Sequence, residues 1–118
     1  MTTATIIVSD QLLVRTLSFE DNAIRTVIKD GEMWWVAADV CRTIGIKTPQ
    51  AAYARLDDDE KGVVKDDSFG GSHPLMTVNE SGLYKLILRS NLPKAQTFRK
   101  WITSEVLPNL RKHGRFDQ

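Results

Sequence analysis

The feature that most constrains the fold is a pair of β-branched and aromatic segments separated by a short polar turn. The segments are Ala23–Ile28 and Met33–Val36, and Asp30-Gly31 between them suits the positive φ angles of a tight hairpin turn. Successive side chains of a strand point to opposite faces, so Trp34 and Trp35 cannot share one face. The hairpin therefore predicts one tryptophan in the core and one that covers a helix, a partner or solvent.

Two amphipathic helical patterns follow in the C-terminal third. The first starts at Asn79, whose side chain suits the N-cap position of a helix. Leu83, Leu86 and Ile87 recur at helical spacing after it, and Leu88 widens the apolar stripe. This segment predicts a helix that packs on the core.

The second pattern runs from Pro93 to about Lys112 and stops at Gly114. Its apolar positions fall within one half of a helical wheel: Ala95, Phe98, Trp101, Ile102, Val106 and Leu110. Pro108 lies inside the pattern, has no N–H and clashes with the carbonyl four residues back. We therefore expect a kink or break between Ser104 and Leu107.

Two shorter helices are predicted directly after the hairpin. Ala37–Ile44 reads as a helix that ends at Gly45, a residue favoured just past a helix end. Thr48 then serves as an N-cap for a helix over Pro49–Leu56, with proline at its first position. The two helices have the outline of a helix-turn-helix, which any helix–loop–helix pair produces.

A second hairpin is predicted between the two groups of helices. Asp57–Gly62 forms an acidic turn, and Val63–Lys65 and Leu75–Val78 have the composition of strands. The hairpin would have a long tip from Asp66 to His73, which contains two adjacent glycines.

The predicted fold class is α+β, with small antiparallel hairpins packed with four to five short helices and a C-terminal helical pair. At 118 residues the chain is a single domain, 1–118. Residues 1–16 contain no clear signal for a turn or a helix end, and Thr5–Val8 and Leu12–Arg15 are either short strands or a loose arm.

Bulk features favour a cytoplasmic protein. A lone cysteine cannot form an internal disulfide, so a reducing compartment fits best. The apolar run Ile6–Val8 is too short for a signal peptide, and no stretch approaches the ~20 apolar residues of a membrane span.

No set of residues predicts catalysis, a metal, a cofactor or a small-molecule substrate. Cys41 falls on the inner face of its predicted helix, and His73 and His113 lie far apart in the sequence. Gly70-Gly71 lacks the lysine and spacing of a phosphate loop, and Asp57–Glu60 reads as a solvated acidic turn. We therefore expect a protein that binds rather than catalyses.

The charge distribution supplies candidates for nucleic-acid binding. The formal net charge is +1, but residues 82–118 carry 8 Lys/Arg against 2 Asp/Glu, and residues 1–81 carry 8 against 13. The basic part is either a contact surface or a solvated helix face. The candidate DNA-binding residues are Lys47, Thr48, Gln50, Arg55, Arg89, Lys94, Arg99, Lys100, Arg111 and Lys112. Of these, Gln50 and Arg55 have the side chains that read adenine and guanine edges.

Four segments carry a resemblance to a known family. Trp35–Cys41 has an aromatic-V-A-x-D-V-C pattern, and Leu56–Val63 contains D-E-K-G-V. Thr77–Ser90 contains N-E-S-G-L-Y-x-L-I-x-x-S. Phe98–Pro108 contains F-x-x-W-x-x-x-E-V-L-P, and Arg111–Gly114 follows as R-x-x-G. In order and spacing these resemble the Bro-N domain, the N-terminal module of baculovirus BRO proteins and of phage and prophage antirepressors.

The resemblance implies an α+β fold and a role in phage or viral gene regulation. The implied partner is duplex DNA, a phage repressor protein, or both, and a homodimer is expected. The alternative is an oligomerisation or protein-interaction module without direct DNA binding, for which Trp34 is the candidate contact. Many family members carry a further C-terminal domain, so this chain is either a short member or the N-terminal module of a longer protein.

Overall fold

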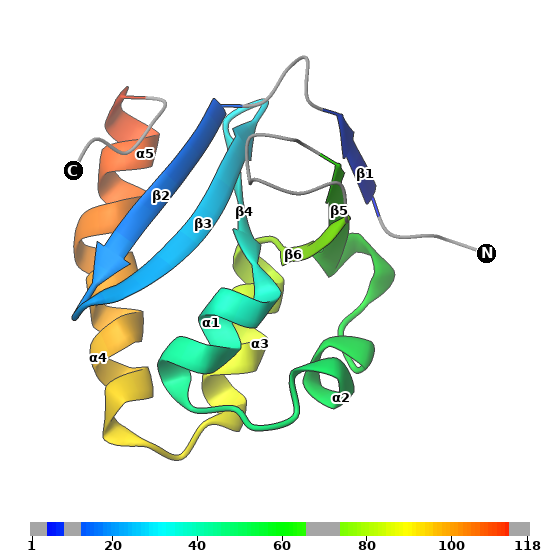
Figure 1. Ribbon diagram of the computed structural model, residues 1–118. Coiled ribbons are helices and arrows are strands. Elements are labelled where there is room, and N and C mark those ends of the chain that lie inside the picture. The colour runs from blue at the N-terminus through cyan, green and yellow to red at the C-terminus, as the bar shows by residue number, and fades with distance from the viewer. Residues whose placement is uncertain (1–4, 9–12, 66–73, 114–118) are drawn as a thin grey trace.

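A single six-stranded sheet forms one layer of the protein, and helices pack against it (Figure 1). The computed structural model describes residues 5–8, 13–65 and 74–113. The strand order is β1-β5-β6-β4-β3-β2, with β1 parallel to β5 and the other described pairs antiparallel. The strands are β1 (Thr5–Val8), β2 (Leu13–Phe19), β3 (Asn22–Lys29), β4 (Glu32–Val36), β5 (Lys61–Lys65) and β6 (Leu75–Val78).

The described helices come in two groups along the chain, one after β4 and one after β6, and this separation of strands from helices confirms the predicted α+β class. Figure 1 shows α4 and α5 as parts of one long helix that runs along β2, with α1 and α3 below the sheet. The helical elements are α1 (Ala37–Ile44), α2 (Pro49–Ala54), a 3-10 turn η2 (Asp58–Glu60), α3 (Glu80–Arg89), α4 (Pro93–Trp101), a π segment η4 (Ile102–Val106) and α5 (Leu107–His113).

Both hairpins among β2, β3 and β4 close with two-residue turns. Asp30 and Gly31 have φ angles of 54° and 79°, as the sequence predicted. The first hairpin turns at Glu20 and Asp21, whose φ angles are 47° and 68°. Because neither residue is glycine, this turn gave no clear sequence signal. Of the two alternatives left open for Leu12–Arg15, a strand or a loose arm, the structure has a strand from Leu13, and it extends to Phe19; Leu12 lies outside the described residues. The predicted tip 66–73 also lies outside them.

The two tryptophans point to opposite faces of β4, as expected. Trp35 is fully buried in the main core, where its ring meets Phe98 edge-on at 6.4 Å between centroids. Trp34 lies in a second cluster with Val27 and Val64, on the other face of the sheet. The core is therefore built on both faces of the sheet, with the helices on the larger side.

The C-terminal helix changes its hydrogen-bonding pattern where Pro108 predicted a break. The π segment Ile102–Val106 contains Ser104, the residue four positions before the proline. One prediction in this region was wrong, because Leu88 is 75% exposed and does not widen the stripe of α3. Leu88 lies on the solvent-facing side of α3, whereas Leu86 and Ile87 lie on the side that packs in the core.

Candidate nucleic-acid interface

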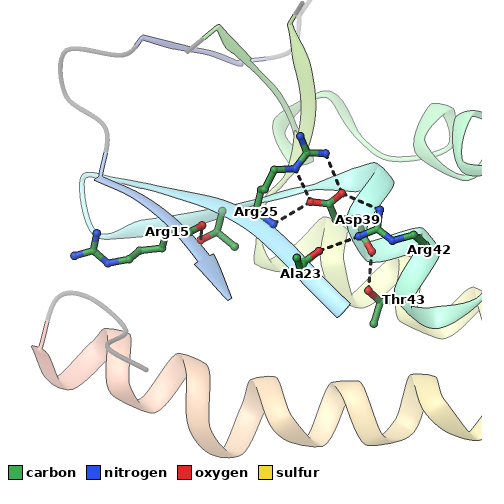
Figure 2. A network of polar contacts seen from close by, with 7 residues as sticks. Arg15, Ala23, Arg25, Asp39, Arg42 and Thr43 are labelled. Carbon is green, nitrogen blue, oxygen red and sulfur yellow. Dashed lines mark hydrogen bonds and ion pairs between the residues drawn. The ribbon is translucent and has the colours of Figure 1, made fainter. Parts of the chain in front are cut away.

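The buried carboxylate of Asp39 joins the sheet to α1 (Figure 2). Its Oδ2 accepts hydrogen bonds from the Arg25 backbone N–H at 3.0 Å and from Arg25 Nε at 2.8 Å. Its Oδ1 accepts from Arg25 Nη2 at 3.0 Å and from Arg42 Nη1 at 3.1 Å. The described pairing of β3 with β4 ends at Thr26 and Trp35. The backbone N–H of Arg25, the neighbouring residue of β3, therefore donates to Asp39 instead of to a carbonyl of β4.

These bonds determine the ionisation of Asp39. Burial by itself disfavours the charged form, but the hydrogen bonds and positive charge of Arg25 outweigh it, with a smaller contribution from Arg42. The pKa of Asp39 therefore lies below its ordinary value. This aspartate of the aromatic-V-A-x-D-V-C segment serves the fold, since its oxygens are occupied by groups of the chain itself.

A second buried carboxylate, Glu60, joins two further signature segments. Glu60 Oε2 accepts a hydrogen bond from the Ser81 hydroxyl, and Oε1 accepts from Lys85 Nζ at 2.9 Å and the Asp57 N–H at 2.8 Å. The backbones are linked as well, because the Asn79 N–H donates to the Glu60 carbonyl at 3.2 Å. The D-E-K-G-V turn and the N-E-S-G-L-Y helix therefore form one structural unit.

The contacts of Glu60 also determine the ionisation and burial of the acidic turn. Burial opposes ionisation of Glu60, and the hydrogen bonds from Ser81 and Lys85 overcome it, so the pKa of Glu60 is lowered. Asp57 and Asp59 have oxygens near Glu60, and Lys85 neutralises part of this cluster at 3.2 Å from Asp57 Oδ2. The turn was predicted to be solvated, but its fourth residue is buried in this network.

The cysteine lies in the core of the protein. Cys41 is fully buried on the inner face of α1, as predicted, and burial raises the pKa of its thiol to about 11. A thiol of this kind is protonated at neutral pH and is a poor nucleophile. It packs here as a small apolar side chain.

The ten candidate DNA-binding residues are all exposed, and the fold divides them into groups. The largest group lies where two turns meet, between α1 and α2 and between α3 and α4, at the lower end of the molecule in Figure 1. The Ser90 hydroxyl ties the turns together by donating to the Ile44 carbonyl at 2.7 Å. The Ser90 hydroxyl oxygen also accepts a hydrogen bond from the Leu92 N–H at 3.3 Å.

A hollow of about 360 Å³ lies between these turns. It is lined by Gly45, Ile46, Lys47, Thr48, Arg89, Ser90, Asn91 and Leu92. Lys94 lies at its rim, because a Cβ added to Gly45 would be 3.4 Å from Lys94 Nζ. We call Lys47, Arg89 and Lys94, with the hollow they surround, the basic corner.

No acidic side chain lines the basic corner. Within the part of the chain that the structure describes, Lys47, Arg89 and Lys94 make no ion pair. Among the described residues no acidic group pairs with these three positive charges, so they are open to solvent or to a ligand. The sequence placed Arg89 and Lys94 with the C-terminal basic residues and Lys47 with the short helix pair. Because Lys47 comes from the acidic part of the chain, the charge split could not indicate that the three lie together.

The other basic candidates lie elsewhere, and two of them, Arg111 and Lys100, have acidic neighbours. Arg111 contacts Glu80 at 3.2 Å, and Arg99 and Arg111 both lie near Tyr84, whose pKa is raised by burial and by Glu80. Lys100 shares a separate hollow with Glu105, and Lys112 is exposed on α5.

Of the candidates at α2, Thr48 lines the basic corner, whereas Gln50 and Arg55 lie outside its lining. Thr48 precedes α2 as predicted, but its side chain makes no capping hydrogen bond, and the helix ends at Ala54 rather than Leu56. Gln50 lines an apolar groove with Tyr53 and Met76, while Arg55 is exposed just past the helix end. The pair α1–α2 therefore presents no basic recognition helix of ordinary length.

Trp34 has little surface to offer to a partner. It is only 5% exposed, and its ring lies against Gly62, where an added Cβ would be 3.0 Å from Trp34 Cε3. The missing side chain of Gly62 leaves room for the indole ring beside β5, which accounts for part of its burial. A role for Trp34 in protein contacts stays a prediction.

Gly45 connects the stability of the fold to the shape of the basic corner. Its φ of 82° is left-handed, and a Cβ there would lie 2.4 Å from Leu92 Cδ1. We expect Gly45→Ala to lower the free energy of unfolding by about 1–2 kcal/mol, mostly through backbone strain. Urea unfolding measures this loss, and Gly31→Ala is the control, since it is also left-handed but has no neighbour within 4 Å. Equal losses in the two variants would rule out a contribution from Leu92.

In the part of the chain described here, no helix is long and apolar enough to cross a membrane.

Comparison with known proteins identifies the family. The sequence pattern of the BRO family, N-terminal domain, matches residues 23–108. An uncharacterized protein of Haemophilus influenzae is 33% identical over 112 residues, which cover 91% of this chain and 54% of that protein. The putative Bro-N domain-containing protein 289L of Invertebrate iridescent virus 6 is 26% identical over 102 residues, covering 70% of this chain and 24% of its own length.

A shorter match involves the putative Bro-N domain-containing protein 019R of Invertebrate iridescent virus 3. It is 44% identical over 39 residues, covering 33% of this chain and 10% of that protein. The chain thus spans about half the length of the Haemophilus relative and smaller shares of the viral ones. No solved structure matches significantly. The family match and the four signature segments, two of which the structure joins through Glu60, show that this chain belongs to the BRO family as its N-terminal, or Bro-N, domain.

Proposed function

We propose that this chain is a phage- or prophage-type regulator of transcription that acts by binding a macromolecule. Membership of the Bro-N family supports a regulatory role, and the relatives named for this domain are viral proteins. The observation that supports DNA as the partner is the basic corner, where three cations have no acidic neighbour in the lining of the hollow. A regulator of this class works in the cytoplasm of a bacterial host, where its operator lies.

A second candidate partner is a repressor protein. The apolar groove between α1, α2 and β6 supports it, because Met76 is 53% exposed there beside Tyr53. Methionine and tyrosine are enriched in protein interfaces. In this alternative, the chain relieves repression by occupying the repressor rather than the operator.

The two candidates are separated by one set of binding measurements. We expect the purified chain to shift duplex DNA from its own genomic region in a gel at low salt. The same chain is then added to the repressor encoded beside it, with and without operator DNA. Release of the repressor from its operator without any shift of DNA by the chain alone would favour the protein-binding alternative, and absence of both effects would refute the proposal.

The proposal includes a homodimer, because dimeric DNA-binding proteins match two-fold symmetric sites. Sedimentation equilibrium of the isolated chain tests it. A mass that stays at the monomer value of 13.3 kDa at all concentrations would refute the dimer and leave DNA binding open.

A further inference from the structure

The basic corner has the chemistry of a phosphate site. Two lysines and an arginine surround a hollow that also presents the hydroxyl of Thr48 and the amide of Asn91. Cations and small hydrogen-bond donors of this kind contact the phosphate and sugar groups of nucleic acids. A protein ligand of the opposite charge would meet the same cations, but the hollow contains only two apolar side chains, Ile46 and Leu92, to hold it.

The geometry of the basic corner is held by the chain itself. The Ser90–Ile44 hydrogen bond fixes the end of α3 against the end of α1, and Gly45 leaves room for Leu92 and Lys94. The cations therefore project from the α1–α2 turn, from the end of α3 and from the start of α4, all parts of a packed scaffold. This arrangement lowers the entropy lost when a ligand is bound. Because the charges repel each other and have no acidic neighbour in the lining, a polyanion gains by lying across all three.

The side chains suited to reading bases lie outside this hollow. Gln50 lines the apolar groove, and Arg55 follows α2, so neither belongs to the lining of the basic corner. A contact made by Lys47, Arg89 and Lys94 would therefore neutralise phosphates and carry no sequence information of its own.

We infer that the basic corner holds the phosphodiester backbone of duplex DNA and does not read base edges. The inference rests on the proposed DNA-binding function and assigns that function to one of several basic surfaces. Sequence preference, where the protein has it, must come from a different surface or from a partner domain.

The test compares two triple variants of the full chain with equal loss of charge. The first is Lys47→Ala/Arg89→Ala/Lys94→Ala, and the matched control changes Arg99, Lys100 and Lys112 to alanine. All six side chains are exposed, and each triple changes the formal net charge from +1 to −2. Circular dichroism and urea unfolding confirm that both variants fold before binding is measured.

Affinity for two duplexes of unrelated sequence is measured by fluorescence anisotropy between about 0.05 and 0.2 M salt. We expect the corner triple to lose about tenfold or more in affinity at 0.1 M salt, equally for both duplexes. The slope of log affinity against log salt should fall by about 2–3, because each lost phosphate contact removes about 0.9. The control triple should change the slope by less than about 1.

The outcomes distinguish this inference from the proposed function. If the unmodified chain binds DNA but the control triple loses as much as the corner triple, the assignment to the basic corner is wrong and DNA binding stands. A loss confined to one of the two duplexes would overturn the exclusion of base reading. If the unmodified chain fails to bind either duplex at the lowest salt, both the inference and the DNA-binding function fall together.

Discussion

Replacing Asp39 with alanine should lower the free energy of unfolding by about 2–4 kcal/mol. The variant leaves the Arg25 backbone N–H at the end of the sheet ladder without its acceptor, and it removes the carboxylate that joins Arg25 and Arg42 to α1. Loss of one partner from a buried pair costs about 3–5 kcal/mol, but the side chains of Arg25 and Arg42 are 33% and 55% exposed and can turn to water. The expected loss is reduced accordingly.

Urea unfolding followed by circular dichroism measures this change. With a slope of about 2 kcal/mol per molar urea, the middle of the range for small proteins, the midpoint should fall by roughly 1–2 M. The control is Asp58→Ala, whose carboxylate is exposed and lies 3.9 Å from Lys61 Nζ, and it should cost less than about 0.5 kcal/mol. Similar midpoints for the two variants would show that the Asp39 network adds nothing to stability.

The ionisation of Asp39 also predicts the direction of a pH effect. Its pKa is lower in the folded chain than in the unfolded chain, so the unfolded state binds the proton more tightly. The stabilisation is fully present above the unfolded value of about 3.9 and is lost as pH falls through the lower folded value. The stability difference between the original chain and Asp39→Ala should therefore be constant from neutral pH to about 5 and should shrink below about 4. A difference that grows on acidification would contradict the assigned direction.

Glu60→Ala should lower the free energy of unfolding by about 2–3 kcal/mol. The substitution removes the acceptor for Ser81, for Lys85 and for the Asp57 N–H, and it leaves the Asn79–Glu60 backbone bond to link η2 to the start of α3. The carboxylate lies just beneath Lys85, which is itself exposed, so we expect a smaller loss than for Asp39. Thermal and urea unfolding both measure it.

Two further variants identify the cause of that loss. Glu60→Gln keeps an acceptor for Ser81 but no charge for Lys85, and it should recover part of the stability. Glu105→Ala removes an exposed carboxylate of the same type and should stay within about 0.5 kcal/mol of the original chain. If Glu60→Ala were as stable as Glu105→Ala, the link between the two signature segments would have no energetic weight.

These expectations give the Bro-N signatures a structural meaning. Asp39 and Glu60 belong to the segments that identify the family, and both are buried and hydrogen-bonded to other parts of the chain. Phe98 and Val106 of the last segment are fully buried as well. The buried residues of the signatures therefore identify the scaffold. Of the basic corner, Lys47 and Lys94 lie outside the signature segments, and Arg89 lies at the exposed end of the third.

Local sequence patterns were enough to predict most elements. The hairpin turn at Asp30-Gly31, the end of α1 at Gly45 and the N-cap of α3 at Asn79 each depend on backbone preferences of a few residues, and all three are confirmed. The disturbance before Pro108 was predictable for the same reason, since a missing N–H acts on the preceding turn of the helix. The turn at Glu20-Asp21 escaped because its residues adopt positive φ without being glycine.

By itself, the sequence determined most of the strands and helices after residue 22 and most of their apolar faces, because these follow from short-range periodicity. Only the tertiary structure decided that β1 pairs in parallel with β5, that Glu60 is buried, and that Lys47 shares a hollow with Arg89. Those contacts join residues far apart in the chain, and packing of whole elements against one core brings them together. The basic residues of the corner do not recur at a regular spacing in the sequence, so no pattern groups them. They lie together because the α1–α2 and α3–α4 turns are neighbours in the fold, joined by the hydrogen bond from Ser90 to Ile44.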